Sequence, residues 1–304
     1  MILVLLLYAL FASVFTIAKT GLEYSQPLFF VGVRMAFAGI FLLAYQLLFS
    51  KDRIAWNRLK WSKILLLGLC NIYLTNVCEF WGLKYLTSIK TCLIYSLSPF
   101  LSALFSYLIF SEKMSFKKWG GLIIGCVGLL PILLQHTVEE ESAGQFFIFS
   151  WPELAVLSAA VLSVYGWILL RQLVREEGHT PILVNGLSML FGGFLATMHS
   201  SLTENWNPIP VTEILPFVEC SLLLIVISNL ICYNLYGYLL RRFSATFMSF
   251  AGFTTPFFTA LFGWIYLGES VSWTFFLATT IQLGGLFLFY QEELLRKPAA
   301  QQAV

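Results

Sequence analysis

Long apolar runs, separated by short polar stretches, follow one another from the first residues of the chain almost to its end. A helix that crosses a bilayer needs about 20 predominantly apolar residues, with a range of roughly 17–25. Ten runs meet this length, and we interpret each as a membrane-spanning helix. They lie at 2–18, 28–49, 62–83, 88–110, 118–136, 152–170, 181–199, 214–236, 244–267 and 274–290.

The composition supports the membrane interpretation. Of the 304 residues, 59% are hydrophobic and 11% are charged, and the mean hydropathy is +0.81, whereas soluble domains carry about 25% charged residues. A water-soluble core could not bury so much apolar surface in a chain of this length. We therefore predict an all-α integral membrane protein. The net charge of +2 gives no reason to expect a nucleic-acid partner.

The distribution of Lys and Arg predicts the orientation, because these residues are retained on the cytoplasmic side of the membrane. With the N-terminus inside, fourteen of the eighteen lie in cytoplasmic segments. Only Lys19 and Lys84 lie outside, while Arg34 and Lys90 lie within spans. We therefore predict a multi-pass protein of the inner membrane with both termini in the cytoplasm.

A segment of the fourth run has a near-copy in the ninth. SLSPFLSALFSYLIFSE at 96–112 aligns without gaps with FTTPFFTALFGWIYLGE at 253–269, at an offset of 157 positions. Five spans, an odd number, separate the copies, so the second half enters the membrane upside down relative to the first. Inverted repeats of this kind build many secondary transporters, whose substrate site lies near the midplane between the halves.

Both halves end with the same elements in the same order. Each has Ser/Thr-Pro-Phe in its fourth span, a Glu soon afterwards (SEKMSFKKWGG; GESVSWTFF) and a Gly-rich fifth span (GGLIIGCVGLL; QLGGLFLFY). On these motifs the chain resembles the EamA family of the drug/metabolite transporter superfamily over nearly its whole length. The resemblance implies two inverted five-helix repeats, at 1–136 and 152–290, joined by an external loop at 137–151 and followed by a cytoplasmic tail at 291–304.

The resemblance also implies a function. Members of this superfamily move small metabolites by secondary active transport and alternating access, and they share a fold while differing in cargo. In length and aromatic content the chain is similar to the S-adenosylmethionine/S-adenosylhomocysteine carriers of intracellular bacteria. Export of an amino acid or another metabolite is the alternative.

Polar groups inside the predicted spans are costly in lipid and usually face a cavity or a partner. Asn76 and Glu79 share one face of the third span with Tyr73, so that this face could bind a substrate amine or a proton. Alternatively, Glu79 is hydrated near the outer end of the span. Arg34 and Lys90 are candidates for binding an anionic group, although Lys90 could instead pair with Glu79 or reach the headgroups.

Further candidates come from the eighth and fourth spans. Glu219 is interpreted as a buried ionisable group. Asn229, Tyr233 and Tyr236 follow helical spacing and could form a stripe that stacks on a flat ring. For the two tyrosines we favour the other interpretation, an aromatic belt at the cytoplasmic interface. Tyr95 of the fourth span completes the predicted substrate-binding set.

Pro99 and Pro256 occupy equivalent positions in the two copies. Each removes a backbone donor and weakens its helix, so that the fourth and ninth spans could bend as gates; a static kink is the alternative. Glu112 and Glu269, which follow these spans, are predicted to stabilise the N-terminus of the next helix.

No motif predicts catalysis or a bound metal. The histidines lie near span ends, no Gly-rich phosphate loop is present, and the six cysteines lie within apolar runs. A membrane enzyme or lipid-handling protein is disfavoured because the chain holds one Asp, Asp52, in a basic loop. A channel is disfavoured because one chain already contains two facing halves. We expect a monomer or homodimer in the lipid bilayer that binds a small molecule without a cofactor.

Overall fold

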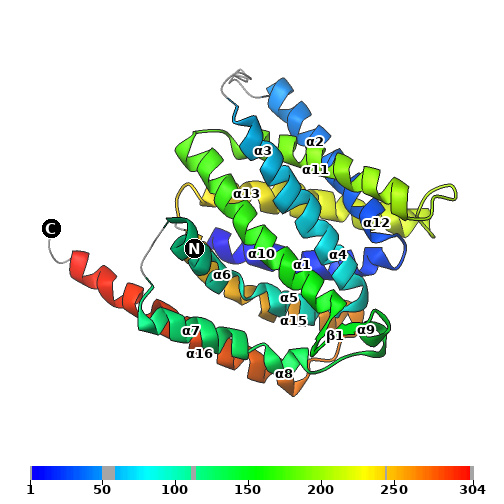
Figure 1. Cartoon of the computed structure of the whole chain (residues 1–304). Coiled ribbons are helices and arrows are strands. Elements are labelled where there is room, and N and C mark those ends of the chain that lie inside the picture. Colours follow the sequence, from blue (N-terminus) through cyan, green and yellow to red (C-terminus); the bar gives the residue numbers. More distant parts are fainter. Residues whose placement is uncertain (1, 50–58, 111–113, 244, 302–304) are drawn as a thin grey trace.

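The computed structural model of the chain describes residues 2–49, 59–110, 114–243 and 245–301, most of them helical (Figure 1). The all-α prediction is confirmed; the strands in this part of the chain are a short hairpin of β1 (Gln145–Phe146) and β2 (Phe149–Ser150). Several sequence predictions fall outside the described residues. They concern the charges of Lys51, Asp52, Arg53, Arg58 and Lys113 and the cap Glu112.

The helices follow one another in two sets, one for each half of the chain. The first set comprises α1 (Ile2–Leu22), α2 (Pro27–Phe49), α3 (Trp61–Leu67), η2 (Gly68–Leu74), α4 (Thr75–Tyr85), α5 (Ser88–Tyr95), α6 (Ser98–Phe110), α7 (Phe116–Val127), α8 (Leu130–Leu133) and α9 (Val138–Ser142). The second comprises α10 (Trp151–Arg171), η3 (Gln172–Glu176), α11 (Pro181–Thr203), α12 (Ile214–Leu224), η4 (Ile225–Cys232), α13 (Tyr233–Leu239), α14 (Ala245–Ala251), η5 (Gly252–Thr254), α15 (Thr255–Leu267) and α16 (Trp273–Gln301).

Nine helical stretches of the described residues are long and apolar enough to cross a membrane. They correspond to the predicted spans other than the ninth. The region predicted as the ninth span consists of α14, the 3₁₀ turn η5 and α15, so its helix is interrupted. The count of ten spans therefore remains a prediction.

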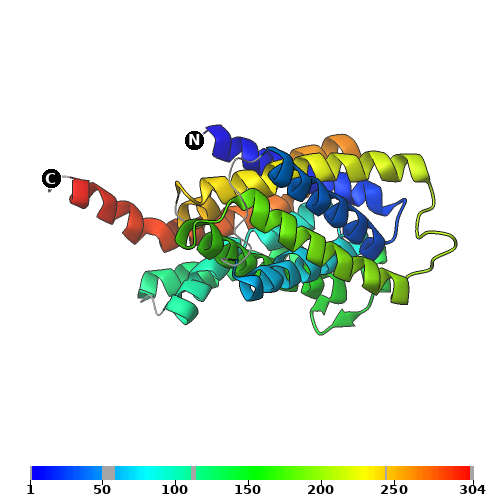
Figure 2. The same cartoon turned by 90° about the horizontal axis from the view of Figure 1, so that it is seen from above.

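The two chain termini lie at the same end of the helix bundle (Figures 1 and 2). We call this the terminal end. The opposite end carries the β1–β2 hairpin, α9 and the connection from α11 to α12, and we call it the hairpin end. An even number of membrane crossings places both termini on the same side of the membrane, as is seen here.

Equivalent helices of the two halves pack closely against each other. A Cβ on Gly193 of α11 would lie 2.5 Å from the backbone N of Ala36 in α2, and one on Gly121 of α7 would lie 2.5 Å from the carbonyl oxygen of Gly285 in α16. Helices that come this close need small residues at the contact, a common device in membrane bundles. The α2–α11 and α7–α16 pairs therefore join the two repeats.

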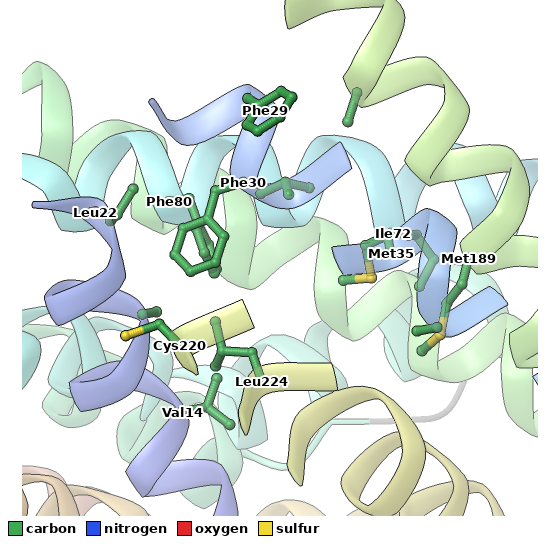
Figure 3. Close-up of a cluster of buried hydrophobic side chains, with 14 of the residues drawn as sticks. Val14, Leu22, Phe29, Phe30, Met35, Ile72, Phe80, Met189, Cys220 and Leu224 are labelled. Carbon is green, nitrogen blue, oxygen red and sulfur yellow. The ribbon is translucent and has the colours of Figure 1, made fainter. Parts of the chain in front are cut away.

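A large apolar cluster is also shared by the two halves (Figure 3). Phe29, Phe30 and Phe80 come from the first half, and Cys220 and Leu224 come from α12 of the second. The rings of Phe30 and Phe80 meet edge to face at 5.4 Å between centroids. The two repeats therefore have one common core at this level of the bundle.

The repeat extends to an unusual local geometry. The third and eighth spans both contain a stretch of π-helix, which begins at Gly68 in η2 and at Ile225 in η4. These positions are 157 residues apart, the same offset that relates the two copies in the sequence. A π-helix is rare and is frequently found at functional sites.

Both prolines of the repeated motif stand at the start of a half-helix. Pro99 is the second residue of α6 and Pro256 the second of α15. A proline in the first turn loses no hydrogen bond, because the N–H groups there have no partner within the helix. The fourth span is thus broken at Ser96 and Leu97, between α5 and α6, and a matching break lies at η5. Gating at these breaks remains a prediction.

Candidate binding cavity

A cavity of about 160 Å³ lies between the two halves, at the level of both helix breaks. The first half lines it from α1, α2, α4, α5 and α6, and the second from α10, η4, α13, η5 and α15. Pockets that enclose drug-sized ligands measure roughly 300–1,000 Å³. A large metabolite would therefore fit only if the two halves separate further.

Arg34 of α2 lies on the cavity wall and is almost completely buried. Its Nη2 donates a hydrogen bond to Oδ1 of Asn76, and its Nη1 lies 3.5 Å from Oδ1 of Asn229. The guanidinium also lies over the ring of Phe80, 4.4 Å from the ring centroid. Among the described residues, it forms no ion pair of 4.0 Å or less. The positive charge is therefore held by neutral groups.

The π-helical turn of η2 orients the amide that holds Arg34. Nδ2 of Asn76 donates to the carbonyl oxygens of Asn71 at 3.1 Å and Ile72 at 2.9 Å. Because the nitrogen faces these two acceptors, Oδ1 must be the atom that faces the guanidinium. The amide orientation thus follows from the hydrogen-bond network, which is the usual basis for assigning it.

The second half contains a similar arrangement at Asn234, one residue after the position equivalent to Asn76 in the repeat. Nδ2 of Asn234 donates to the carbonyl oxygens of Asn229 at 3.2 Å and Leu230 at 3.0 Å, in the π-helical turn η4. Its Oδ1 accepts from Nδ2 of Asn185 at 3.0 Å. In both halves, a π-helical turn therefore fixes the orientation of an Asn amide. In the second half that amide binds Asn185, and in the first half it binds the charged Arg34.

Glu79 brings a second charge to the cavity. Its Oε2 accepts a hydrogen bond from the hydroxyl of Tyr95 at 2.6 Å, and both residues line the cavity. The ring of Tyr95 packs against Phe15 of α1, with 5.7 Å between centroids. Arg34 and Glu79 are the charged side chains on this wall among the described residues.

Aromatic rings form the opposite part of the wall. Trp167 of α10 lies 4.2 Å from the ring of Tyr236 and 5.1 Å from that of Tyr233, between centroids. Tyr233 reaches the polar site, because its hydroxyl lies 3.5 Å from Nδ2 of Asn76. An apolar surface therefore continues directly from the charged groups.

Each helix break at the cavity is supported by a different helix. At the first break, the Ser96 hydroxyl donates to Oε1 of Gln282 in α16 at 2.7 Å. At the second, the Tyr8 hydroxyl of α1 donates to the carbonyl oxygen of Met248, and a Cβ on Gly252 would lie 3.0 Å from the Tyr8 ring. The two breaks are equivalent in sequence but differ in their surroundings.

Six of the nine predicted binding residues meet at this site. Five line the cavity: Arg34, Asn76, Glu79, Tyr95 and Tyr233. Asn229 is fully buried behind Arg34, and its Nδ2 lies 2.9 Å from the sulfur of Met35. Their roles in binding remain predictions.

The favoured interpretation of Tyr233 and Tyr236 as an interfacial belt is wrong. Both are buried and line the cavity. The π-helical segment η4 immediately before them changes which face of the helix points inward, and spacing based on 3.6 residues per turn does not include that change.

Lys90 does not line the cavity, and the predicted pair with Glu79 is wrong. Its Nζ lies 2.8 Å from Glu140 and 2.6 Å from Glu153, and all three side chains are buried. Lys90 thus fixes the start of α5 to the loop between the repeats and to α10. His136 lies near the same carboxylates, at 3.8–3.9 Å, and the ammonium group already occupies the place between them.

Glu219 and Tyr73 also lie outside the cavity lining. Glu219 is exposed on the surface of α12, so the prediction of a buried carboxylate is wrong. The Tyr73 hydroxyl is 2.9 Å from Nδ1 of His199 in α11. Because apolar residues surround both positions in the sequence, periodicity alone could not tell a lipid-facing side from an inward-facing one.

Glu269 caps a helix, although a different one from that predicted. Its carboxylate accepts from the backbone N of Ser88 at 2.7 Å, from the Ser88 hydroxyl at 2.8 Å and from the backbone N of Ile89 at 3.2 Å. The capped helix is therefore α5 of the first half, where the prediction named the following helix, α16. The contact joins the two halves at the hairpin end.

Tyr8, Trp167 and Tyr236 line the cavity but were absent from the predicted set. Trp167 and Tyr8 lie in apolar runs without a polar pattern around them, so neither had a sequence signal stronger than packing.

Comparisons with known proteins agree with this architecture. The sequence profile of the EamA-like transporter family matches residues 1–134 and, a second time, residues 150–291. A solved structure titled "Crystal structure of protein" has the same fold, with a TM-score of 0.65 and 17% identity, and the match covers 94% of this chain and 93% of that one.

Curated relatives include two chlamydial proteins, both named S-adenosylmethionine/S-adenosylhomocysteine transporter. The protein of Chlamydia muridarum (strain MoPn / Nigg) is 41% identical over 285 residues, which are 93% of this chain and 89% of that protein. The protein of Chlamydia trachomatis serovar L2 is 40% identical over 93% of this chain and 86% of its own length.

Proposed function

This chain belongs to the EamA-like transporter family, and from that premise we propose that it exchanges S-adenosylmethionine for S-adenosylhomocysteine across the inner membrane by alternating access. The chain is a multi-pass membrane protein. Its similarity to the two chlamydial carriers extends over 93% of its length.

One observation carries the choice of substrate class. Arg34 is a buried cation that faces the cavity and is held by the amides of Asn76 and Asn229. A buried charge without a counter-ion is costly, and an anionic ligand group would relieve this cost. Both proposed substrates carry an α-carboxylate, together with an α-ammonium group suited to Glu79.

The aromatic part of the cavity wall suits the adenosyl group of the proposed substrates. Adenine is flat and stacks on aromatic side chains, which contributes about 1–3 kcal/mol per base in nucleic-acid complexes. Trp167, Tyr233 and Tyr236 offer such surfaces beside the charged groups. We propose that the adenosyl group lies against them.

The orientation predicted from the basic residues makes the terminal end cytoplasmic. The cavity lining extends toward that end, to Tyr8 near the start of α1 and to Leu240 just after α13. At the hairpin end, Glu269 and the start of α5 hold the halves together. On this basis we assign the structure to the inward-facing part of the transport cycle.

Counterflow in proteoliposomes tests the proposal. Vesicles loaded with unlabelled S-adenosylhomocysteine should take up labelled S-adenosylmethionine and concentrate it transiently, whereas empty vesicles should not. External S-adenosylhomocysteine should compete, and methionine and adenosine should not. Uptake that is independent of internal substrate, or counterflow with simple amino acids alone, would overturn the proposed exchange in favour of an amino-acid carrier or another metabolite exporter.

A further inference from the structure

Two side chains of opposite charge, Arg34 and Glu79, line the same cavity. Arg34 and Glu79 reach the same cavity from α2 and α4, yet no ion pair between them is present among the described residues. Arg34 is bound by amide oxygens, and Glu79 is bound by a phenol hydroxyl. Neutral partners fix the positions of both groups, and neither group has an oppositely charged side chain within 4.0 Å among the described residues.

Each group also has one polar atom for which no hydrogen bond is found among the described residues. Arg34 uses Nη1 and Nη2 for Asn229 and Asn76, while its buried Nε has no hydrogen-bond partner in the described part of the chain. Tyr95 donates to Oε2 of Glu79, and no hydrogen bond to its Oε1 is found in the described part of the chain. Buried polar atoms are almost always paired, and one that is not requires an explanation.

We propose that Arg34 and Glu79 form a clamp for the free α-amino acid end of the ligand, with the carboxylate on Nε of Arg34 and the ammonium on Oε1 of Glu79. The clamp rests on the proposed transport function and adds the orientation of the ligand within the cavity. Ligands that lack both charged groups, such as adenosine or 5′-methylthioadenosine, are then rejected because both buried charges stay unpaired.

The π-helical turn makes this clamp specific. If Nδ2 of Asn76 were free to face Arg34, the amide would repel the guanidinium instead of binding it. The carbonyl oxygens of Asn71 and Ile72 prevent that rotation by accepting from Nδ2. The clamp is thus held in its binding geometry before the ligand arrives, which reduces the entropy lost on binding.

Removing a charge from the protein and from the ligand in the same experiment tests the clamp. Binding of S-adenosylmethionine and of its decarboxylated form should be measured by calorimetry on the purified protein and on Arg34→Gln. We expect the wild type to prefer the carboxylated ligand by about 10- to 100-fold, because charge-assisted hydrogen bonds are the strong ones. In Arg34→Gln this preference should fall below about 3-fold.

Glu79→Gln supplies the second arm. It should weaken binding of S-adenosylhomocysteine by about tenfold or more, while leaving an analogue that lacks the α-amino group nearly unaffected. Lys84→Gln and Glu219→Gln are matched controls, because both remove an exposed charge away from the cavity. Both controls should retain wild-type ligand preferences.

Several outcomes would overturn the clamp. One is an equal loss of both ligands in Arg34→Gln, which would make Arg34 a structural residue. Another needs no variant and is independent of folding defects: a wild-type protein that binds decarboxylated S-adenosylmethionine as well as the parent compound.

Failure of the proposed substrate would be distinguishable from failure of the clamp. If the wild type bound neither S-adenosyl compound, the proposed exchange would be wrong. The clamp would then be tested by thermal shift with L-amino acids and the amines formed by their decarboxylation. Stabilisation by the acids and not by the amines would support it, and equal or absent stabilisation by both would overturn it.

Discussion

The two ends of the helix bundle hold the halves together with contacts of different strength. At the hairpin end, carboxylates of the second half bind backbone N–H groups of the first: Glu269 at α5, and Glu204 at Leu28 and Phe29 of α2. At the terminal end, Lys63 pairs with Glu177 at 2.7 Å, but the lysine side chain is 37% exposed. A second contact there joins Gln46 and Thr180 at 3.4 Å.

The difference indicates which end opens more easily. A carboxylate at a helix N-terminus gains charge-assisted hydrogen bonds and a favourable interaction with the helix dipole. An exposed ion pair contributes about 0–1 kcal/mol. The hairpin end is therefore the stronger closure in this state, and transport requires that its contacts break and are replaced by water.

The largest effect is expected at Lys90, where the start of α5 is fixed at the hairpin end. Lys90→Met leaves the buried carboxylates of Glu140 and Glu153 without their cation, which should lower the free energy of unfolding by about 3–5 kcal/mol. Chemical denaturation in detergent measures this loss. The triple variant Lys90→Met/Glu140→Gln/Glu153→Gln should recover most of it, and an equal loss in both variants would contradict the role of the ion pairs.

A smaller effect is expected at Glu269, and it concerns the balance between the two open states. In Glu269→Gln an amide has one accepting oxygen in place of two, and the charge is lost. We expect the free energy that keeps the hairpin end closed to fall by about 1.5–3 kcal/mol. The population of the state open at this end should then rise by roughly tenfold or more. Spin labels at Tyr85 and Leu267 should report longer distances.

Glu213→Gln is the matched control for that measurement, because Glu213 is an exposed carboxylate at the same end whose side chain caps no helix. Its distance distribution should match that of the wild type. If Glu269→Gln also left the distribution unchanged, the carboxylate would not be the element that keeps this end closed.

At the terminal end, Tyr8→Phe removes the hydrogen bond that the Tyr8 hydroxyl donates to the carbonyl oxygen of Met248. The expected cost is about 0.5–1.5 kcal/mol, confined to the region of the second helix break. Hydrogen exchange of the amides in α14 and η5 should accelerate about tenfold or less. Tyr45→Phe, at an exposed position of α2, serves as the control, and equal acceleration in both variants would exclude a specific contact.

The smallest effect is expected for Lys63→Gln. Loss of this partly exposed ion pair should change the free energy of unfolding by no more than about 1 kcal/mol. Unfolding of Lys63→Gln and Glu269→Gln under the same conditions compares the two ends directly. A larger loss in Lys63→Gln than in Glu269→Gln would reverse the proposed order of strength.

Periodicity and repetition predicted the membrane class and the paired halves, because both depend on patterns within the chain. Contacts between the halves were less predictable. Glu269 was expected to act on a helix that follows it in sequence, yet its partner is Ser88, 181 residues away. Nothing in the sequence near Glu269 indicates so distant a backbone donor.

For the candidate site, too, the inward position of some residues could be predicted from the sequence, but their partners could not. Arg34, Asn76 and Glu79 could be identified because a charged or amide group within an apolar run has few alternatives to an inward position. Lys90 satisfied the same rule, but it found its counter-charges in Glu140 and Glu153. Glu219 did not follow the rule, because it lies in the first turns of α12, where a carboxylate can reach the membrane surface.

The π-helical segments have a consequence for how the walls of the cavity are aligned. Each residue of an α-helix advances the chain by about 100° around its axis, and a π turn holds an extra residue. Deleting one residue within Gly68–Leu74 or Ile225–Cys232 should restore ordinary winding. Because the wide turn accommodates that one extra residue, the rest of the helix would keep its side, and Glu79 or Tyr236 would still face the cavity. The wide turns thus hold an extra residue without changing the rotational phase of either helix.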